Sequence, residues 1–270
     1  MNQSPSSGDQ GTYVQVNGLR MYYESHGEGT PVILLHGGLE TCQMWAPVVS
    51  VLSRCHRVIT PDSRGHGRTA RSDENISYAL MAEDIARFIQ VLELDKPFLA
   101  GYSDGGQVAL TMAINYPGLV RGYMIGATEL AMTEAFRQTL HGPLGFEGPG
   151  RVDFERIAQT NPGLITSLQE KHDVYHEPGY WKILLEEASR YWLSPPHYTS
   201  ADLMKIVDPT LFWFGDRDVF CPPEQALELY RMVNKSELAV IPNADHFTMM
   251  QQIEIANMIL LDFMKRVIGG

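Results

Sequence analysis

The chain has 270 residues, of which 44% are hydrophobic, and it carries a formal net charge of −11. This length fits one α/β domain with an insertion or two small domains, and the apolar content suffices for a large core. The negative charge argues against nucleic acids and anionic membrane surfaces as partners. Three scattered cysteines, Cys42, Cys55 and Cys221, support neither a disulfide framework nor a structural zinc site. They fit a reducing compartment, so we expect a cytoplasmic protein.

The first residues, 1–11, are polar and rich in Ser, Gly and Pro, and they lack the apolar stretch of a signal peptide. We expect a disordered leader there. No apolar run elsewhere in the sequence is long enough to span a membrane. Two alternating runs, 12–16 and 19–24, flank the pair Asn17-Gly18, and this arrangement predicts a β-hairpin.

The next part of the chain alternates short apolar runs with segments of helical periodicity. Strands are expected at 32–35, 56–60, 97–100 and 120–127, and helices at 43–53, 85–92 and 107–113. Between 128 and 205 we find no strand-like run. That part contains helical segments at 133–140, 154–159, 165–172 and 180–192, separated by Pro and Gly.

The alternation then resumes, with strands expected at 210–214 and 237–241 and helices at 223–233 and 254–267. Alternating strands and helices predict a mostly parallel sheet with helices on both faces. We therefore expect an α/β core formed by residues 12–127 and 206–270. The segment 128–205 is expected to form a helical cap over it.

One stretch of the predicted core has the pattern of a site for a nucleophilic serine. Residues 101–105 read Gly-Tyr-Ser-Asp-Gly directly after the apolar run 97–100 and before the helical run 107–113. A serine on such a sharp strand-to-helix turn projects its hydroxyl out of the sheet, and glycines are needed where the turn packs closely. Ser103 is therefore the candidate nucleophile.

A serine hydroxyl needs a base, and the base needs an orienting group. His246 follows the strand expected at 237–241, and Asp218 follows the strand expected at 210–214. Carboxyl ends of parallel strands deliver residues to one crevice, and the chain order Ser, acid, His is the one that this fold class requires. Asp216 in the same loop and Asp245 beside His246 are rival acids, although neighbouring residues cannot easily orient each other.

A tetrahedral oxyanion would need preorganised N–H donors. The backbone N–H of Asp104, directly after the nucleophile, is one candidate. The second should come from the loop after the strand 32–35. We expect the N–H of Leu39 to serve, with Gly38 as the alternative.

Five motifs together resemble the α/β-hydrolase superfamily. They are Gly-Tyr-Ser-Asp-Gly-Gly at 101–106, His-Gly-Gly at 36–38, Asp-Ser-Arg-Gly-His-Gly at 62–67, Gly-Asp-Arg-Asp at 215–218 and Ala-Asp-His-Phe at 244–247. The resemblance implies an α/β-hydrolase fold with an eight-stranded sheet, a helical cap, and neither cofactor nor metal. Within the superfamily the chain is similar to small microbial esterases and lactonases, including esterases that open N-acyl homoserine lactones, and to valacyclovir-hydrolase-like esterases.

The family pattern also bears on the rival residues. It places the acid about three residues after the glycine that ends the strand, which favours Asp218 over Asp216. In some relatives the acid follows an earlier strand, which corresponds here to 120–127, and this makes Glu129 a further alternative. His172 and His176 have a spacing close to that of zinc ligands on a helix, but the usual Glu is missing, so a surface or cap role is preferred. His66 is expected to hold its own loop.

A cap must leave a pocket above Ser103, and such pockets are largely apolar. The candidate lining residues in the cap are Met132, Phe136, Phe146, Trp181, Leu184 and Trp192. They favour a small-molecule ester or lactone with an apolar acyl or aromatic group. No feature of the sequence indicates an oligomeric state.

The sequence thus predicts a metal-independent serine hydrolase of carboxylic esters that works through an acyl-serine, with lactones such as N-acyl homoserine lactones as a candidate substrate class. Two alternatives keep the fold. In one, the same three side chains serve a hydroxynitrile lyase or perhydrolase. In the other, the protein is a ligand receptor with slow turnover, since fold alone does not decide among these functions.

Overall fold

The computed structural model describes residues 11–269. The predicted leader lies outside these residues apart from Gly11, which begins the first strand. Eight strands form one sheet in the order β1-β2-β4-β3-β5-β6-β9-β10. Their bounds are β1 Gly11–Val16, β2 Leu19–His26, β3 Thr30–Leu35, β4 His56–Pro61, β5 Phe98–Tyr102, β6 Gly122–Gly126, β9 Thr210–Gly215 and β10 Ser236–Ile241. The predicted eight-stranded α/β fold is confirmed.

The predicted N-terminal hairpin is formed by β1 and β2, which pair in antiparallel register. Its turn residues Asn17 and Gly18 have φ values of 45° and 75°. Two successive positive φ values are what a type I′ hairpin turn requires, and Asn-Gly is a pair that favours that turn strongly. From β4 to β10 the neighbouring strands run parallel.

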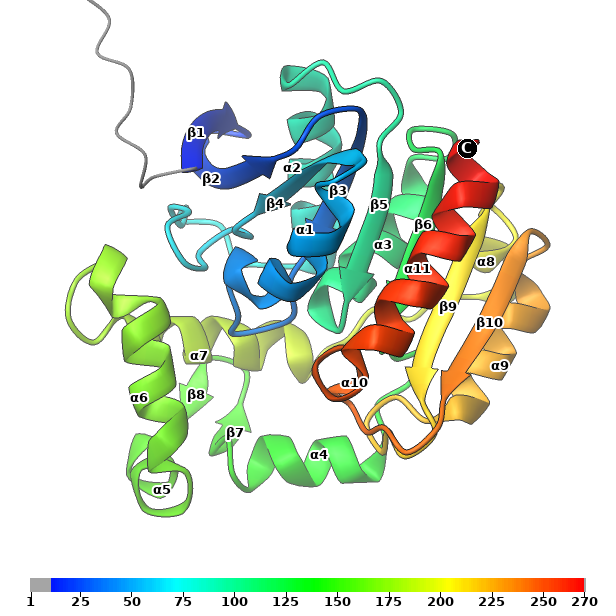
Figure 1. Cartoon of the computed structure of the whole chain (residues 1–270). Helices are drawn as coiled ribbons and strands as arrows, with labels where there is room; N and C mark the ends of the chain where they lie inside the picture. Colours follow the sequence, from blue (N-terminus) through cyan, green and yellow to red (C-terminus); the bar gives the residue numbers. More distant parts are fainter. Residues whose placement is uncertain (1–10, 270) are drawn as a thin grey trace, which may run out of the picture.

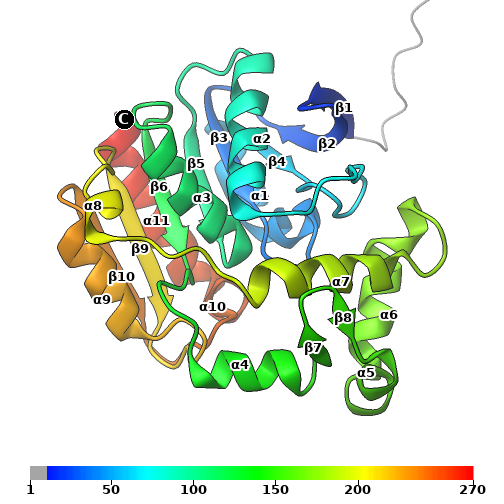
Figure 2. The same ribbon diagram turned by 180° about the vertical axis from the view of Figure 1, so that it is seen from behind.

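Helices cover both faces of the sheet (Figures 1 and 2). One face is covered by α1 (Ala46–Leu52) and α11 (Ile253–Ile268), and the other by α2 (Tyr78–Val91), α3 (Asp104–Asn115) and α9 (Pro223–Met232). The central parallel strands β5, β6 and β9 are buried along their whole length, and they read as mostly apolar runs because both of their faces are covered. No helix within residues 11–269 has the length and apolar character needed to cross a bilayer.

The segment 128–205 lies beyond the carboxyl ends of the parallel strands (Figure 1). It consists of α4 Glu134–His141, β7 Phe146–Gly148, β8 Arg151–Val152, α5 Phe154–Thr160, α6 Pro162–Lys171, a 3₁₀ turn Asp173–Tyr175, α7 Tyr180–Trp192 and α8 Ser200–Leu203. We refer to it as the cap. The expectation that it contains no strand is wrong, because β7 and β8 form a small hairpin. Strands of three and two residues are too short to show an alternating pattern.

Two buried histidines fix the loops that follow β3 and β4. His36 accepts a hydrogen bond from the N–H of Ser63 at 2.9 Å through Nε2. His66 accepts one from the N–H of Leu39 at 3.3 Å, again through Nε2. The Nδ1 atom of each ring faces a backbone carbonyl, at 2.7 and 3.0 Å respectively. Both rings must therefore be neutral, with the proton on Nδ1. They connect the two loops to each other.

A third histidine, His172 at the end of α6, joins the cap to these loops. Its Nδ1 accepts a hydrogen bond from the N–H of Gly67 at 2.9 Å, and its Nε2 donates to the carbonyl of Leu39 at 3.1 Å. The side chain is fully buried, and an ion pair of 2.6 Å between Lys171 and Glu40 lies beside it. The cap is thus hydrogen-bonded to the backbone of the loop that carries Gly37 and Gly38.

Replacing His172 with Ala should destabilise the protein. The substitution removes two buried hydrogen bonds and leaves a buried N–H and a buried carbonyl without partners, which should cost about 2–4 kcal/mol. We expect that loss in the free energy of unfolding measured with urea. The matched control is His197→Ala, at an exposed histidine of the same cap. Equal effects of the two substitutions would contradict the role given to His172.

The same three rings give a pH prediction. Burial lowers the pKa of His36 to about 4 and those of His66 and His172 to about 3. All three should therefore remain neutral at pH 5, as measured by NMR of the imidazole protons. Because these folded values lie below the ordinary value of 6.5, the unfolded chain takes up protons first. The three rings therefore make stability fall as the pH drops below about 6.5. A ring that protonates near pH 6.5 would show that its hydrogen bonds are not those described.

Candidate functional site

Ser103 lies on the turn between β5 and α3, with φ 55° and ψ −118°. A positive φ is uncommon for a non-glycine residue and marks a strained position of the kind found at functional sites. A Cβ at Gly101 would lie 2.0 Å from the carbonyl oxygen of Gly105, and one at Gly105 would lie 2.2 Å from that of Leu35. Only glycine fits at these two positions, as the motif predicts.

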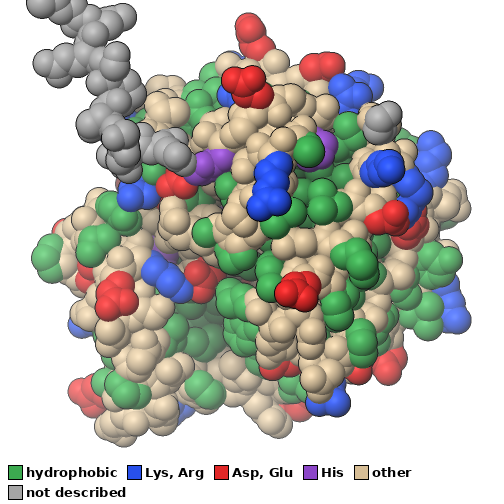
Figure 3. All heavy atoms as spheres, in the orientation of Figure 1, with side chains coloured by type: hydrophobic (Ala, Val, Ile, Leu, Met, Phe, Trp, Pro, Cys, Tyr) green, Lys and Arg blue, Asp and Glu red, His purple; other side chains and the backbone are tan. Residues whose placement is uncertain are grey.

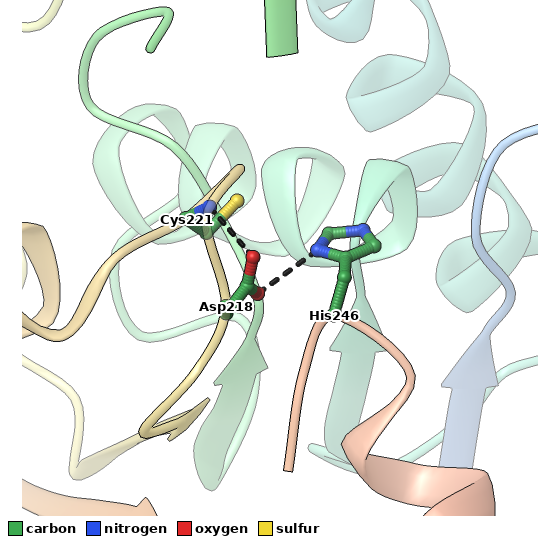
Figure 4. A group of neighbouring side chains, drawn as sticks. All are labelled: Asp218, Cys221 and His246. Atoms are coloured by element: carbon green, nitrogen blue, oxygen red, sulfur yellow. Dashed lines mark hydrogen bonds and ion pairs between the residues drawn. The ribbon is translucent and has the colours of Figure 1, made fainter. Parts of the chain in front are cut away.

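The three side chains expected to meet form a hydrogen-bonded row. The Oγ atom of Ser103 lies 3.0 Å from Nε2 of His246, and Nδ1 of His246 lies 2.9 Å from Oδ2 of Asp218. The other oxygen of Asp218 accepts the backbone N–H groups of Phe220 and Cys221, at 2.9 and 2.8 Å. Figure 4 shows the bonds of Asp218 to Cys221 and to His246. The buried carboxylate is thereby fixed, and it favours the tautomer in which Nδ1 carries the proton. Nε2 is then free to accept the proton of the serine hydroxyl.

The rival acids lie elsewhere. Asp216 is exposed and accepts a hydrogen bond from the N–H of Ala244 at 3.1 Å. Asp245 is also exposed and accepts the N–H of Phe247 at 2.8 Å, in a turn. Both carboxylates thus stabilise local backbone, and Asp218 is the carboxylate hydrogen-bonded to His246.

The expected role of Leu39 in an oxyanion site is wrong. Its N–H is directed at His66, at 3.3 Å, and Leu39 does not line the cavity described below. The alternative, Gly38, does line that cavity, and a Cβ there would lie 2.5 Å from Oδ2 of Asp104. The N–H groups of Gly38 and Asp104 donate to no other group of residues 11–269. The sequence could not show which residue of this loop turns its N–H away.

The carboxylate of Asp104 is saturated with donors from two other elements. It accepts hydrogen bonds from Tyr78 in α2 at 2.8 Å, and from Trp192 and Tyr191 in α7 at 2.9 and 3.2 Å. Burial raises the pKa of this carboxyl above its usual value, although the three donors oppose that effect. The side chain next to the candidate nucleophile therefore connects α2, α3 and the cap.

A cavity of about 260 Å³ opens over Ser103 between the core and the cap. Of the predicted lining residues, Phe136 and Trp192 do line it. The others do not, because they pack inside the cap or between cap and core: they are Met132, Phe146, Trp181 and Leu184. The apolar lining residues that the sequence analysis missed are Met44, Tyr78, Tyr102, Ala127, Pro143, Leu144, Phe220, Cys221, Phe247, Met249 and Met250.

Helical spacing explains these errors. Bulky residues at that spacing mark which face of a helix is buried, and they do not distinguish the packing of the cap from the lining of a cavity. Phe146 packs against Trp192 at 5.9 Å between ring centroids, and Trp181 against Phe154 at 5.4 Å. Much of the observed lining comes from loops of the core, where the hydrophobic residues of the sequence show no regular spacing.

Three acidic residues line the cavity: Glu40, Asp104 and Glu129. No Lys or Arg of the described chain is among the lining residues. On the face of the molecule shown in Figure 3, basic side chains lie singly or in small groups among acidic ones. The cavity therefore suits a neutral or cationic molecule better than an anion.

Asp218 and His246 also lie close to Cys221. The potential metal-binding atoms of these three residues lie within 4.8 Å of one another (Figure 4). Each of these atoms already has a hydrogen-bond partner. The thiol of Cys221 donates to the carbonyl of Ala127 at 3.1 Å, and burial raises the pKa of that thiol. A metal ligand would have to be a thiolate. The donor set therefore fits a proton relay better than a metal centre.

His172 and His176 are separated by the end of α6 and a 3₁₀ turn, so they do not share a helix face. The sequence analysis preferred a surface or cap role for this pair, and both residues lie in the cap, where His172 is buried. His176 stacks on Tyr180 at 3.8 Å and lies 3.0 Å from the carbonyl of Gly67. Both rings are thus bonded to backbone. The expected local role of His66 extends to Leu39, as described above.

The chain is similar to known proteins over most of its length. Residues 32–257 match the model of the alpha/beta hydrolase family. The 2-hydroxy-6-oxo-2,4-heptadienoate hydrolase of Pseudomonas putida is 28% identical over 257 residues, which cover 90% of this chain and 91% of that protein.

Two solved structures are also similar. A thermophilic esterase from Thermogutta terrifontis has a TM-score of 0.72 and 25% identity, and the match covers 96% of this chain and 99% of that one. Est816, described as an N-acyl homoserine lactone degrading enzyme, has a TM-score of 0.73 and 23% identity over 93% of this chain and all of that one, which shows a shared fold. Because the family model matches residues 32–257, which are most of the chain, the chain belongs to the alpha/beta hydrolase family.

Proposed function

We propose that the protein is a metal-independent serine hydrolase of carboxylic esters, including lactones such as N-acyl homoserine lactones. The observation that carries the proposal is the row Ser103–His246–Asp218, whose serine opens into a mostly apolar cavity. Gly38 and Asp104, whose N–H groups are the proposed oxyanion donors, line the same cavity as that serine. A nucleophile, a base, an orienting acid and N–H donors are the parts that acyl transfer needs.

In the proposed reaction His246 takes the proton of Ser103 as its oxygen attacks the ester carbonyl. The negative charge that develops on the carbonyl oxygen is stabilised by the N–H groups of Gly38 and Asp104 and by the N-terminus of α3. His246 then protonates the leaving alcohol, and an acyl-serine remains. Water, deprotonated by the same histidine, releases the acid. In a lactone the leaving alcohol stays attached, so the ring opens.

The acidic residues that line the cavity favour a neutral ester as substrate over a carboxylate such as the one named for the Pseudomonas putida relative. The name of the Pseudomonas putida relative specifies a dienoate, which carries a carboxylate. A buried carboxylate needs a cationic or strongly donating partner. The described lining of this cavity has no Lys or Arg and three acidic residues. A neutral ester or lactone avoids that repulsion.

Product analysis separates the proposal from its alternatives. A lyase would release cyanide from cyanohydrins, and a perhydrolase would form peracid from acetate and peroxide. A receptor would show a large ligand-induced rise in melting temperature with little turnover of p-nitrophenyl esters. We expect turnover of p-nitrophenyl esters and of simple and acylated homoserine lactones.

Replacing Ser103 with Ala should abolish turnover. In well-studied triads the loss in kcat is on the order of 10⁶-fold, and we expect a decrease of several orders of magnitude on p-nitrophenyl esters. Ser50→Ala, at an exposed serine of α1 whose hydroxyl bonds to the carbonyl of Pro47, is the control and should leave kcat unchanged. Near-full activity of the Ser103 variant would remove the proposed mechanism.

A second pair of variants tests the acid. Asp218→Asn should hold His246 in the wrong tautomer and lower kcat by about 10⁴-fold, the loss known for such a change. Asp216→Asn, two residues away in the same loop, changes the same charge without touching His246 and should stay within a few-fold of the native kcat. A larger loss with Asp216→Asn than with Asp218→Asn would reverse the assignment.

A further inference from the structure

Two acceptor atoms in the cavity are left without partners. Glu129, which follows β6, lines the cavity and is 8% exposed, and its Oε2 has no hydrogen-bond partner among the described residues. The same holds for Oε1 of Gln107 in α3, which is 2% exposed and also lines the cavity. Buried polar atoms are nearly always hydrogen-bonded, so two orphans at one place need an explanation.

The chemistry of these two atoms is fixed by their surroundings. Nε2 of Gln107 lies 3.3 Å from the backbone carbonyl of Glu129 and must donate to it. The amide orientation therefore follows from a bond that only its NH₂ group can make, and the free atom is the carbonyl oxygen. When Glu129 is ionised its carboxylate oxygens only accept hydrogen bonds, as the amide oxygen of Gln107 does. The place calls for a donor.

Glu129 has no role in the hydrogen-bonded row. Asp218 occupies the position of the orienting acid beside His246. The neighbouring carboxylate of Asp104 is saturated by Tyr78, Tyr191 and Trp192. Glu129 is thus an acid of the cavity lining that neither the proposed mechanism nor the docking of the cap uses.

We propose that Glu129 and Gln107 form a polar subsite that binds a hydrogen-bond-donating group of the substrate, either an N–H or an O–H. The inference deepens the proposed function and rests on it for the identity of the reaction. The substrate class becomes an ester or lactone that is otherwise apolar and carries an amine, amide N–H or hydroxyl group away from the scissile bond. The absence of Lys and Arg from the described lining favours the same class.

The first experiment compares matched esters. The probes are p-nitrophenyl hexanoate and hexanoates bearing an amino or hydroxyl group at successive carbons of the acyl chain. The readout is the ratio of kcat/KM for each substituted ester to that of the unsubstituted one. The native protein should prefer at least one donor-bearing ester, and Glu129→Leu should lower that ratio about tenfold or more, as loss of a buried hydrogen bond does.

Two further variants supply a more conservative substitution of Glu129 and a control for net charge. Glu129→Gln retains the size of the side chain and removes its charge. Assayed at pH 8, where Glu129 is mostly ionised, the preference for an amino group should fall about tenfold or more even if the Leu variant fails to fold. Glu134→Gln removes an exposed acid of the cap and controls for net charge, and it should leave every ratio unchanged. Ratios that fall less than tenfold in both Glu129 variants, at every position of the donor, would overturn the subsite.

A binding measurement separates this inference from the proposed function. If the native protein turns over none of these esters, or if Ser103→Ala remains active, the proposed function fails and the subsite is tested by melting temperature. Hexylamine and hexan-1-ol, which donate, should raise the melting temperature of the native protein more than 2-hexanone, which only accepts. Glu129→Leu should abolish that difference. Equal shifts by all three compounds on the native protein would overturn the subsite.

The ligand-free protein offers one more readout. Burial and the charge of Asp104 raise the pKa of Glu129 to about 7, and the other titratable groups coupled to it are Tyr78 and Cys221. An unfolded glutamate ionises at a lower pH, so this group makes stability fall as the pH rises from about 4.5 to 7. Glu129→Leu should raise the melting temperature more at pH 8 than at pH 5. A rise that is larger at pH 5 would show that the carboxyl is already paired.

Discussion

The hydrogen bond between Ser103 and His246 depends on three loops meeting at one edge of the sheet. The serine follows β5, the aspartate follows β9 and the histidine follows β10, so the side chains come from strands far apart in the sequence. Parallel strands end at the same edge, and this topology brings the three loops together. The strained backbone at Ser103 is held there by glycines whose replacement the packing forbids. The proposed chemistry follows from this arrangement.

The cap and the candidate site share their supports. The carboxylate of Asp104 accepts hydrogen bonds from α2 and α7, and its backbone N–H is one of the two donors proposed for the oxyanion. His172 binds the carbonyl of Leu39, one residue after Gly38. A movement of the cap would therefore disturb the loop that supplies one of the two proposed N–H donors. Stability of the cap and geometry of the site are coupled through these two residues.

Most of the fold could be predicted from the sequence because local patterns determine it. The Asn17-Gly18 hairpin, the buried strands and the helices of the cap all follow from period, turn chemistry and length. The row of Ser103, Asp218 and His246 could be placed because chain order and strand ends constrain it. The β7–β8 hairpin could not, because strands of two or three residues carry no period.

The other wrong predictions from the sequence concern the direction in which a backbone N–H group or a side chain points. The sequence placed Leu39 in the right loop, but the turn that directs its N–H at His66 depends on a ring 27 residues away. Likewise Phe146 and Trp181 face into the cap, which only the packing decides. Glu129 entered the sequence analysis as a rival acid, and its partnerless oxygen in the cavity became visible only once the fold had placed Gln107 beside it.

The central claim is that Ser103 is a nucleophile activated by His246. A fluorophosphonate reacts covalently with such a serine, and mass spectrometry of the digested protein locates the adduct. We predict a single adduct on the peptide that contains Ser103, formed at neutral pH and lost when His246 is replaced with Ala. No adduct, or an adduct on another residue, would contradict it.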